Sequence, residues 1–340
     1  MIQDSLKKIV RKQNLDEQEM AEVMTEVMSG DATEAQIGAL MAALATKGET
    51  FSELAGAARA MRRKATRIQV TAKTVVDTCG TGGDQAFTFN ISTTAALVVA
   101  GCGVTVAKHG NRSVSSKCGS ADLLEALGVR LEVAPELVEE AIREIGIGFL
   151  FAPLYHGAMR HAAKPRRELG IRSIFNMLGP LTNPAGANCQ LLGVYAPELT
   201  EMFAQALRLL GARRALVVHG HDGLDEISVC APTRVSELKD GAIRTFDLTP
   251  EQLLGRQARQ EDLEGGDPAV NAQITRSILD GEKGPRRDVT VINAAAALIA
   301  AGVAEDFPQA IRLAEASIDE KKAAGKLETL IRFTNEVASG

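Results

Sequence analysis

Residues 77–84 read DTCGTGGD, and this stretch has the composition of a phosphate-binding loop. It follows the apolar pair Val75-Val76, so the loop is expected at the end of a strand. Glycines let consecutive backbone N–H groups point into one concavity, and they let a ligand approach without a Cβ in the way. A helix predicted to begin near residues 90–93 adds a positive helix end and the hydroxyls of Ser92 and Thr93. The alternative is a tight turn between a strand and a helix.

A second polar stretch, KHGNRSVSSKCGS at residues 108–120, is predicted to form a loop directly after the strand VTVA. It combines three cations, a histidine and several serine hydroxyls, and Lys108 offers a point charge for phosphate. Two such loops in neighbouring strand–helix units favour a polyanion site more strongly than either loop alone. A solvated charged loop is the alternative, and His109 on its own is typical of a packing or orienting histidine.

A third stretch, HGHDGLDEIS at residues 219–228, follows the strand ALVV and contains three carboxylates, of which Asp225 and Glu226 are adjacent. Adjacent carboxylates beside a phosphate would repel it unless a cation lies between them. Mg²⁺ prefers a few carboxylates together with waters and phosphate oxygens. Zinc held by His219 and His221 is an alternative, although their spacing matches no zinc motif. A charged turn without a metal is the other alternative.

The fourth stretch, AKPRRELGIRSIFNMLGPLTNPA at residues 163–185, contains arginines that could bind a carboxylate. A guanidinium matches a carboxylate with two parallel hydrogen bonds, and Arg166 and Arg167 directly follow Pro165. The prolines and glycines predict that MLGPLTNP has no regular structure, so the stretch is interpreted as a crossover between two domains. Surface arginines on an interdomain linker are the alternative.

The periodicity of the chain predicts a small all-helical N-terminal domain ahead of a larger α/β domain. Residues 1–70 contain four amphipathic segments with helix-start signals, among them Asp16 and the capping-box patterns at Thr33 and Thr50. From Val75 onward strands alternate with helices, which predicts a mainly parallel central sheet flanked by helices. In such sheets the ligand binds beyond the carboxyl ends of the strands, where the polar loops would converge.

Two later segments complete the predicted organisation. The segment DVTVINAAAALIAAG, which begins at residue 288, is predicted to be a strand that leads into a helix. Residues 254–288 contain RQARQEDLEGGDP and DGEKGPRR, and they are predicted to be a connection on the surface.

The composition excludes several functional classes. The chain has 340 residues, 45% of them hydrophobic, which is enough for a sizeable core. A formal net charge of -5 and an aromatic content of 4% argue against a nucleic-acid partner, and no segment has the length and hydrophobicity of a membrane span. Five widely spaced cysteines without a CxxC pair, and an N-terminus without an apolar signal region, predict a cytoplasmic protein.

Together these stretches resemble the anthranilate phosphoribosyltransferase family, which acts at the second step of tryptophan synthesis from chorismate. The typical motifs of that family are D-x-x-G-T-G-G-D, T-F-N-I-S-T, K-H-G-N-R-S-V-S-S-K-x-G-S-A-D, R-R-E-L-G-I-R-x-I-F-N-x-L-G-P-L-T-N-P and H-G-x-D-G-L-D-E. This chain carries each of them in that order, and the resemblance covers nearly its whole length. It departs from the family pattern at Gln85, Phe87, Cys118 and Gly157, none of which has an assigned charge or metal role.

The resemblance implies transfer of the phosphoribosyl group of 5-phosphoribosyl 1-pyrophosphate to the amine of anthranilate, with release of pyrophosphate. It implies a helical domain at residues 1–72 with a returning segment near residues 165–186, and a phosphoribosyl pyrophosphate-binding α/β domain at residues 73–164 and 187–340. It also implies a homodimer formed through the helical domain, and Mg²⁺ as the metal, with two ions per subunit.

The functional residues of the family carry over by motif position. Asp225, Glu226, Lys108 and Arg166 are implied to be catalytic, and Ser92 is implied to hold the metal together with Asp225 and Glu226. Anthranilate is implied to bind at Gly80, His109, Asn111, Arg166 and Pro180. The phosphoribosyl pyrophosphate site is implied to comprise Gly80, Thr81, Gly83, Asp84, Thr88, Asn90, Ile91, Ser92, Thr93, Lys108, His109, Gly110, Asn111, Arg112, Ser113, Val114, Ser115, Ser116 and Ser120.

Two other functions are compatible with this type of fold. A pyrimidine nucleoside phosphorylase would use the same glycine-rich loop for free phosphate, but such enzymes are longer and carry a different basic-loop signature. A non-catalytic nucleic-acid-binding relative would have a basic surface and eroded metal residues, whereas this chain has a net charge of -5 and keeps Asp225 and Glu226. The sequence leaves open whether anthranilate synthase associates with the chain.

Overall fold

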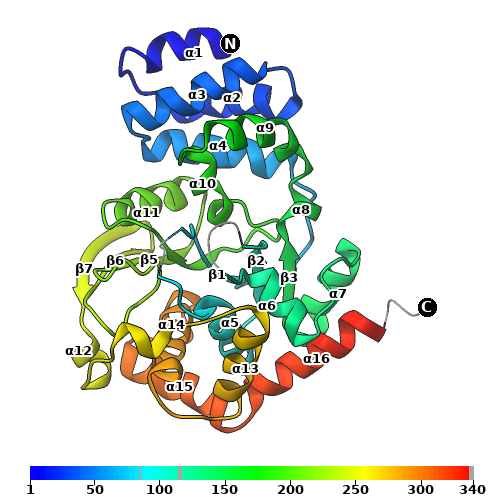
Figure 1. Ribbon diagram of the computed structural model, residues 1–340, viewed down its shortest axis with the longest axis vertical. Helices are drawn as coiled ribbons and strands as arrows, with labels where there is room; N and C mark the ends of the chain where they lie inside the picture. Colours follow the sequence, from blue (N-terminus) through cyan, green and yellow to red (C-terminus); the bar gives the residue numbers. More distant parts are fainter. Residues whose placement is uncertain (84–85, 114–116, 337–340) are drawn as a thin grey trace.

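The chain begins with a helical bundle that is joined to a larger α/β portion (Figure 1). The computed structural model describes residues 1–83, 86–113 and 117–336. The bundle contains α1 (Ile2–Ile9), α2 (Glu17–Ser29), α3 (Glu34–Lys47) and α4 (Phe51–Lys64). The side chains of Asp16, Thr33 and Thr50 each accept a hydrogen bond from the backbone N–H three residues later, which starts α2, α3 and α4 at the predicted caps. The predicted helical N-terminal part is confirmed.

A buried carboxylate fixes the turns of the bundle. Glu53, in the first turn of α4, is fully buried and lies 3.0 Å from the ammonium of Lys47, which is itself buried. It also accepts hydrogen bonds from the backbone N–H groups of Leu15 and Thr50, each at 2.9 Å. Because a buried charge is tolerated only when it is paired and hydrogen-bonded, Glu53 holds the α1–α2 connection against the α3–α4 connection.

A central sheet organises the rest of the described chain. It has seven strands in the order β3-β2-β1-β4-β5-β6-β7. The strands β1 to β5 are parallel, and β6 and β7 form an antiparallel hairpin at one edge, so the predicted α/β class with a mainly parallel sheet is confirmed. The strands are β1 (Val76–Gly80), β2 (Val106–Gly110), β3 (Ile147–Phe151), β4 (Cys189–Gly193), β5 (Arg214–Gly220), β6 (Thr233–Lys239) and β7 (Ala242–Leu248).

Helices cover both faces of this sheet (Figure 1). Along β5, Leu216 and Val218 point into one core, while Ala215 and Val217 point into the other, as the alternation of a strand requires. The core that contains Ala215 and Val217 continues into the bundle, so the bundle and this face of the sheet share one hydrophobic interior. On this face the sheet is covered by α11 (Leu199–Leu209). The helices that pack into the core of Leu216 and Val218, on the opposite face, are α5 (Ile91–Gly101), α6 (Ser120–Leu127), α13 (Pro268–Leu279), α14 (Pro285–Ala301), α15 (Phe307–Asp319) and α16 (Lys322–Glu336).

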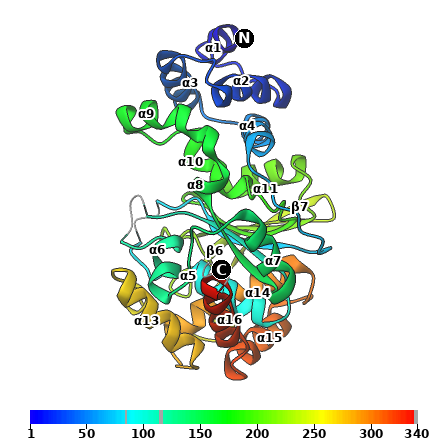
Figure 2. The ribbon, with the colours of Figure 1, turned by 90° about the vertical axis from the view of Figure 1, so that its right-hand side faces the viewer.

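Residues 152–183, here called the crossing segment, run from β3 to the bundle and back to the sheet. The segment contains α8 (Ala152–Tyr155), η1 (Gly157–Met159), α9 (Arg160–Leu169), α10 (Ile174–Leu178) and η2 (Gly179–Leu181). Figure 2 shows α9 and α10 beside the bundle, where α9 packs on α2 and α3, and α10 packs on α4.

The prediction that MLGPLTNP has no regular structure is wrong, because α10 and η2 extend to Leu181. The backbone N–H of Ser173 donates to Asn176 Oδ1 at 3.1 Å, which closes the first turn of α10. Pro180 is tolerated because it lies in the first turn of η2, where a missing N–H costs nothing.

Two further sequence predictions are wrong. Residues 288–301 contain no strand, since they belong to α14, which begins at Pro285. Their β-branched side chains suggested a strand, but α14 packs against β4, β5 and α5, and burial on several sides overrides that propensity. Residues 254–288 are not simply a surface connection, because they include α13 with its buried Asn271. The remaining short helices are α7 (Pro135–Ile145), α12 (Pro250–Leu254) and η3 (Gln260–Leu263).

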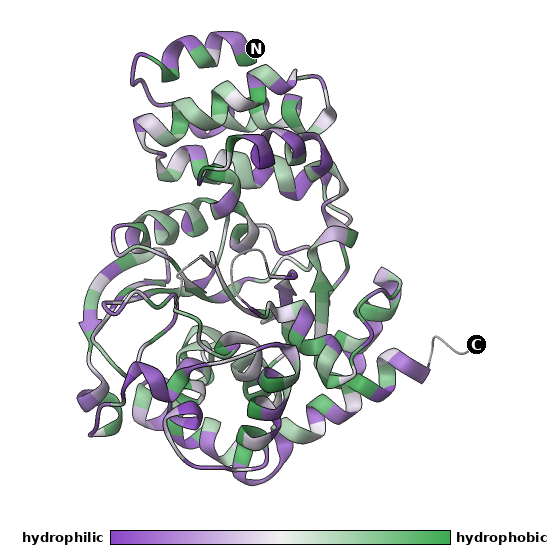
Figure 3. Ribbon diagram, in the orientation of Figure 1, coloured by the Kyte–Doolittle hydropathy of each residue, from purple (hydrophilic) through white to green (hydrophobic). Residues whose placement is uncertain are grey.

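Hydrophilic residues lie along the outer helices of the molecule. In Figure 3 they appear in purple along α9 and α16, at the edges of the bundle and of the α/β portion. Over the described ranges, none of the helices combines the length and the apolar character that crossing a membrane would need.

Candidate active site

The carboxyl ends of the parallel strands meet at one edge of the sheet. Gly80, the last residue of β1, pairs with Gly193, the last residue of β4, and β2 ends beside them at Gly110. The strand β5 runs parallel to β4 and ends at Gly220. The segments that follow these strands are therefore neighbours, as the sequence predicts for an open parallel sheet.

The glycine loop, residues 80–83, lies directly against Asp225. The backbone N–H of Gly82 donates to Asp225 Oδ2 at 2.9 Å, and that of Thr81 donates to the carbonyl of Gly193 at 2.9 Å. A Cβ on Gly80 would lie 2.4 Å from Asp225 Oδ2, and one on Gly193 would lie 1.5 Å from the carbonyl oxygen of Asp225. Glycine is required at both positions because Asp225 of the third polar stretch packs directly onto the ends of β1 and β4.

The start of α5 is fixed at the same edge. Asn90 Oδ1 caps the helix by accepting a hydrogen bond from the N–H of Thr93 at 3.2 Å. The hydroxyl of Thr78 donates to the carbonyl of Ser92 at 2.9 Å, so β1 supports this first turn. The N–H of Asn90 donates to Asn271 Oδ1 of α13 at 2.9 Å. Sequence reasoning missed Asn271, although the Asp-Pro pair just before it is a typical helix start.

Lys108 extends from β2 to the start of α5. Its side chain is buried, and Nζ donates to Ser92 Oγ at 3.3 Å and to the carbonyl of Thr78. The prediction of a loop that begins at Lys108 is wrong at its first three residues, because Lys108–Gly110 belong to β2 and pair with β3. An ammonium group beside a helix N-terminus makes this edge attractive to an anion.

Asp77, the first residue of DTCGTGGD, has a fully buried carboxylate beneath the site. Its Oδ2 accepts from Asn183 Nδ2 at 2.8 Å, and its Oδ1 accepts from the backbone N–H of His109 at 3.2 Å. Burial raises the pKa of Asp77, and the nearby charge of Lys108 opposes that shift. Sequence reasoning assigned no role to Asp77, because nothing in the sequence shows that its partners come from β2 and the crossing segment.

Two neutral histidines lie next to this network. His109 Nδ1 lies 3.2 Å from the carbonyl oxygen of Gly179, and the Nε2 atoms of His109 and His156 are 3.2 Å apart. The contact with Gly179 requires the proton of His109 on Nδ1, so the proton between the rings belongs to His156. His156 Nδ1 is then a buried acceptor without a partner among the described residues. Burial lowers the pKa of His109 to about 3 and that of His156 to about 4.

Arg166 lies on α9, the helix of the crossing segment that packs on α2 and α3 of the bundle. Its guanidinium is half-buried and lies over the ring of Phe175, with 5.6 Å between Cζ and the ring centroid. Burial lowers the pKa of Arg166. Within residues 1–83, 86–113 and 117–336 the guanidinium has neither a hydrogen bond nor an ion pair, so its donors are available to a planar anion. Pro180 is buried near the end of the same crossing segment.

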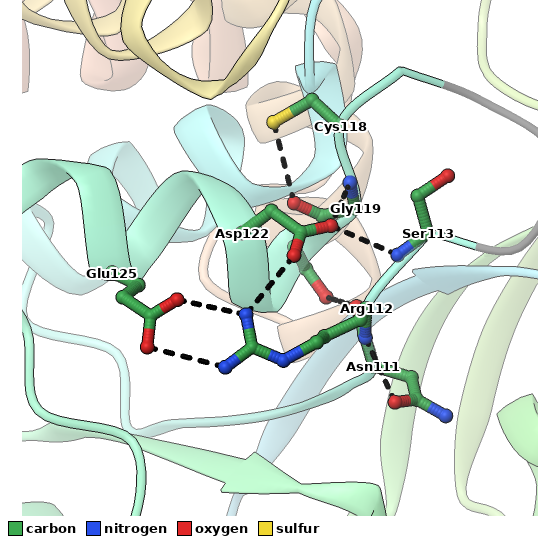
Figure 4. A network of polar contacts seen from close by, with 8 residues as sticks. Asn111, Arg112, Ser113, Cys118, Gly119, Asp122 and Glu125 are labelled. Carbon is green, nitrogen blue, oxygen red and sulfur yellow. Dashed lines mark hydrogen bonds and ion pairs between the residues drawn. The ribbon is translucent and has the colours of Figure 1, made fainter.

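The polar residues after β2 are held by α6 (Figure 4). Asp122 Oδ2 accepts hydrogen bonds from the backbone N–H groups of Ser113 and Gly119, each at 2.9 Å. The guanidinium of Arg112 lies 3.2 Å from Asp122 and 2.7 Å from Glu125. The charge of Arg112 is therefore directed at α6 rather than at the glycine loop.

Gly110 and Ser120 bracket the same polar segment. A Cβ on Gly110 would lie 2.0 Å from Ser120 Oγ, which donates to the carbonyl of Asn111 at 3.3 Å. The first and last residues of the segment are therefore in contact. Four residues assigned to the site from the sequence lie outside the described ranges, namely Asp84, Val114, Ser115 and Ser116.

The oxygen donors at this edge fit Mg²⁺ better than zinc. Asp225 and Glu226 are adjacent and half-buried, and Ser92 presents a hydroxyl at the start of α5. The two histidines of the third stretch have other partners, since His219 Nδ1 donates to the carbonyl of Val194 at 2.7 Å and His221 lies 3.7 Å from Asp247. Among the described residues no group of three or more His, Cys, Asp or Glu side chains is arranged to hold a metal. A carboxylate pair that leaves positions for water and substrate oxygens is typical of Mg²⁺.

Both parts of the chain match models of one known protein family. Residues 3–65 match the helical bundle domain of a glycosyl transferase family, and residues 72–324 match the a/b domain of the same family. The anthranilate phosphoribosyltransferase of Syntrophobacter fumaroxidans is 76% identical over 336 residues, which are 99% of this chain and 100% of that protein.

Solved structures agree with the sequence match. The crystal structure of anthranilate phosphoribosyltransferase from Thermus thermophilus superposes with a TM-score of 0.93 at 46% identity, covering 97% of this chain and 99% of that one. The Saccharomyces cerevisiae enzyme in complex with PRPP and Mg gives a TM-score of 0.89 at 28% identity, covering 98% and 97%. Its complex with 4-fluoroanthranilate gives 0.87 at 28% identity, with the same coverage.

We predict that His109 and His156 stay neutral in the folded protein between pH 5 and 8. Their ring-proton NMR signals, assigned by their loss in His109→Gln and His156→Gln, should keep constant shifts over this range. The unfolded chain takes up both protons near pH 6.5, whereas the folded chain takes them up only near pH 4 and 3. The free energy of unfolding should therefore fall as the pH drops from about 6.5 toward 4. A signal of either residue that titrates with a midpoint near 6.5 would contradict the assigned hydrogen-bond chain.

Proposed function

Since this chain belongs to the anthranilate phosphoribosyltransferase family, we propose that the edge of the sheet described above is its active site. The chain transfers the phosphoribosyl group of 5-phosphoribosyl 1-pyrophosphate (PRPP) to the amine of anthranilate. The products are N-(5-phosphoribosyl)anthranilate and pyrophosphate, and the reaction is the second step of tryptophan synthesis from chorismate. The observation that carries the site assignment is the packing of Asp225 onto the glycine loop beside the N-terminus of α5.

The glycine loop, the start of α5 and the residues after β2 form the proposed PRPP site. Backbone N–H groups and the positive helix end can bind phosphate oxygens, and the buried Lys108 adds a full positive charge next to Ser92. These groups are held in place before the substrate binds, so they can stabilise the negative charge that develops on pyrophosphate as it leaves.

The carboxylates of Asp225 and Glu226, with the hydroxyl of Ser92, form the proposed metal site. The reaction uses Mg²⁺, and we propose two ions per subunit. Mg²⁺ bound here would neutralise charge on the departing pyrophosphate. The hydrogen bond from Gly82 holds the Asp225 carboxylate at the glycine loop.

Arg166 is the proposed partner of the anthranilate carboxylate. Its half-buried guanidinium has the planar pair of donors that a carboxylate needs, and Phe175 limits its orientation. Such a contact would direct the amine toward the anomeric carbon of the ribose, which is the main requirement for this displacement. The aromatic amine is neutral at pH 7 and needs no base to activate it. The neutral His109, next to Gly179 and Pro180, would shape the path of anthranilate without acting as a base.

A nucleoside phosphorylase, the competing enzyme function, receives no support from this geometry. A nucleoside phosphorylase would need only free phosphate at the glycine loop, and the metal carboxylates at Asp225 and Glu226 would have no counterpart in that reaction. Incubation with thymidine or uridine and phosphate separates the two reactions directly.

Two copies of the chain are proposed to associate through the helical bundle. The helices α1, α3 and α9 pack side by side. Large apolar side chains are exposed near the ends of α1 and α9, with Val10 68% exposed and Ile171 48% exposed. Burying such residues against a second copy would remove them from water.

The first prediction from this function concerns the reaction and its metal. The purified protein should consume anthranilate, followed by its fluorescence, only when PRPP and Mg²⁺ are both present. Asp225→Asn should lower kcat/KM about 10²-fold at limiting Mg²⁺, because one charge that attracts the metal is lost. Asp240→Asn, at an exposed turn, is the matched control and should behave as wild type. Unchanged turnover in Asp225→Asn at limiting Mg²⁺ would refute the metal assignment, and phosphorolysis of thymidine or uridine would refute the reaction.

The second prediction concerns the acceptor. Arg166→Gln should raise the KM for anthranilate about 10- to 100-fold, the cost of losing a charge-assisted hydrogen-bond pair. The KM for PRPP should change little. The exposed neighbour Arg167→Gln is the control and should leave both values unchanged. Steady-state kinetics with each substrate varied in turn would decide the point, and an Arg166→Gln enzyme with normal KM for anthranilate would exclude this role.

The third prediction concerns assembly. Sedimentation equilibrium should give twice the mass of the chain, and Val10→Asp combined with Ile171→Asp should give the mass of one chain, because charges in an apolar contact are not tolerated. A single-chain mass for the wild-type protein at micromolar concentration would rule out the proposed dimer.

A further inference from the structure

Arg172 connects the crossing segment to the glycine loop, and none of the roles above uses it. It lies between α9 and α10, and its Nη2 donates to the carbonyl of Gly83. Its guanidinium also lies over the ring of Tyr195, with only 4.2 Å between Cζ and the ring centroid. Within the described part of the chain no carboxylate pairs with it. Arg172 is exposed, and its partners are a backbone carbonyl and an aromatic ring rather than a carboxylate. These contacts depend on the planar shape of the guanidinium as well as on its charge.

The contact with Arg172 restricts a part of the glycine loop whose backbone has few conformational restraints of its own. Gly82 and Gly83 have φ values of +65° and +76°, a region that side-chain-bearing residues seldom adopt. A Cβ on Gly83 would lie 3.0 Å from Arg172 Nη2, so the arginine sits against the bare backbone. Two consecutive glycines have many accessible conformations, and ordering them at the moment of binding would weaken affinity.

The other end of the loop is fixed by the residue on which Arg172 stacks. The backbone N–H of Tyr195 donates to Thr81 Oγ1 at 3.2 Å, and the N–H of Thr81 donates to the carbonyl of Gly193 at 2.9 Å. Tyr195 follows β4, so the start of the loop is attached to the sheet. Arg172 therefore links Tyr195, which is bonded to Thr81 near the start of the loop, to Gly83 at the end of the loop.

We propose that Arg172 is a positioning residue that holds the glycine loop in the shape that receives the phosphates of PRPP. The proposal rests on the proposed function, since it assumes that PRPP binds at this loop. Arg172 acts on the loop through one hydrogen bond to Gly83 and one stacking contact with Tyr195. Its effect is on PRPP, whereas Arg166, six residues earlier on the same segment, is the proposed partner of anthranilate.

Arginine suits this position in a way that lysine does not. A planar guanidinium can lie flat on the tyrosine ring and still donate from its edge to the Gly83 carbonyl, whereas an ammonium group has no plane to stack. We therefore expect Arg172→Lys to restore only part of what Arg172→Gln loses.

The test is calorimetric titration of PRPP in the presence of Mg²⁺, combined with steady-state kinetics for both substrates. Arg172→Gln should weaken PRPP binding about tenfold, the size expected for one charge-assisted hydrogen bond with its stacking contact. The KM for anthranilate should stay within about twofold of wild type, and the thermal midpoint should be unchanged. Arg167→Gln, on the same segment but away from the loop, serves as the matched control.

A double-mutant cycle checks that Arg172 acts through the tyrosine ring. Tyr195→Leu should also weaken PRPP binding, and the variant that combines it with Arg172→Gln should be no weaker than Arg172→Gln alone, because both changes remove the same support. Tyr195→Phe keeps the ring but loses the hydroxyl that also interacts with Arg172, so it should weaken PRPP binding less than Tyr195→Leu does. If Arg172→Gln unfolds, Tyr195→Leu and Arg172→Lys still report on the contact.

The outcomes separate this inference from the proposed function. A wild-type protein that fails to bind PRPP would overturn the proposed function itself. A wild-type protein that binds PRPP, with Arg172→Gln or Tyr195→Leu binding it equally well, would overturn only the positioning role. Equal weakening of PRPP and anthranilate would also overturn it, because that pattern indicates a general structural defect.

Discussion

One buried carboxylate holds together the parts of the molecule that build the site. Asp77 belongs to β1, but its hydrogen bonds come from the backbone of β2 at His109 and from Asn183 at the end of the crossing segment. A charge without water is tolerated only when its partners are all in place. The pairing of β1 with β2, the approach of Lys108 and the return of the crossing segment are therefore mutually dependent.

The crossing segment is also bonded to the bundle, so the position of the bundle depends on the same contacts. Arg62 of α4 is half-buried, and this desolvation lowers its pKa to about 10. Its guanidinium donates to the carbonyls of Leu181 at 2.6 Å and Leu210 at 3.4 Å. Leu181 is the last residue of η2 and Leu210 directly follows α11, so a single side chain of the bundle caps the ends of both helices. Arg166, Arg172 and Gly179 lie on a segment that is fixed at both the bundle and the sheet.

The sequence predicted the elements whose signals are local and missed those that depend on tertiary partners. The caps at Asp16, Thr33 and Thr50 act within four residues, so the bundle could be predicted. The β-branched run of α14 indicated a strand, because only the assembled core shows that this helix is covered on several sides. At the site, the glycine loop and the carboxylates of the third stretch were recognisable by type. Asn271 and Arg172 could not be predicted, because each acts on a residue at least 89 positions away.

The hairpin of β6 and β7 has a consequence for solubility. β7 is an edge strand, and unpaired edges are templates on which other chains can add strands and aggregate. Here Arg234 faces Asp247 at 2.6 Å and Glu237 faces Arg244 at 2.5 Å, so charged cross-strand pairs cover the hairpin. A second sheet could add to this edge only by burying those charges. The charged hairpin therefore disfavours the addition of a further strand at β7, which is one of the two edges of the sheet.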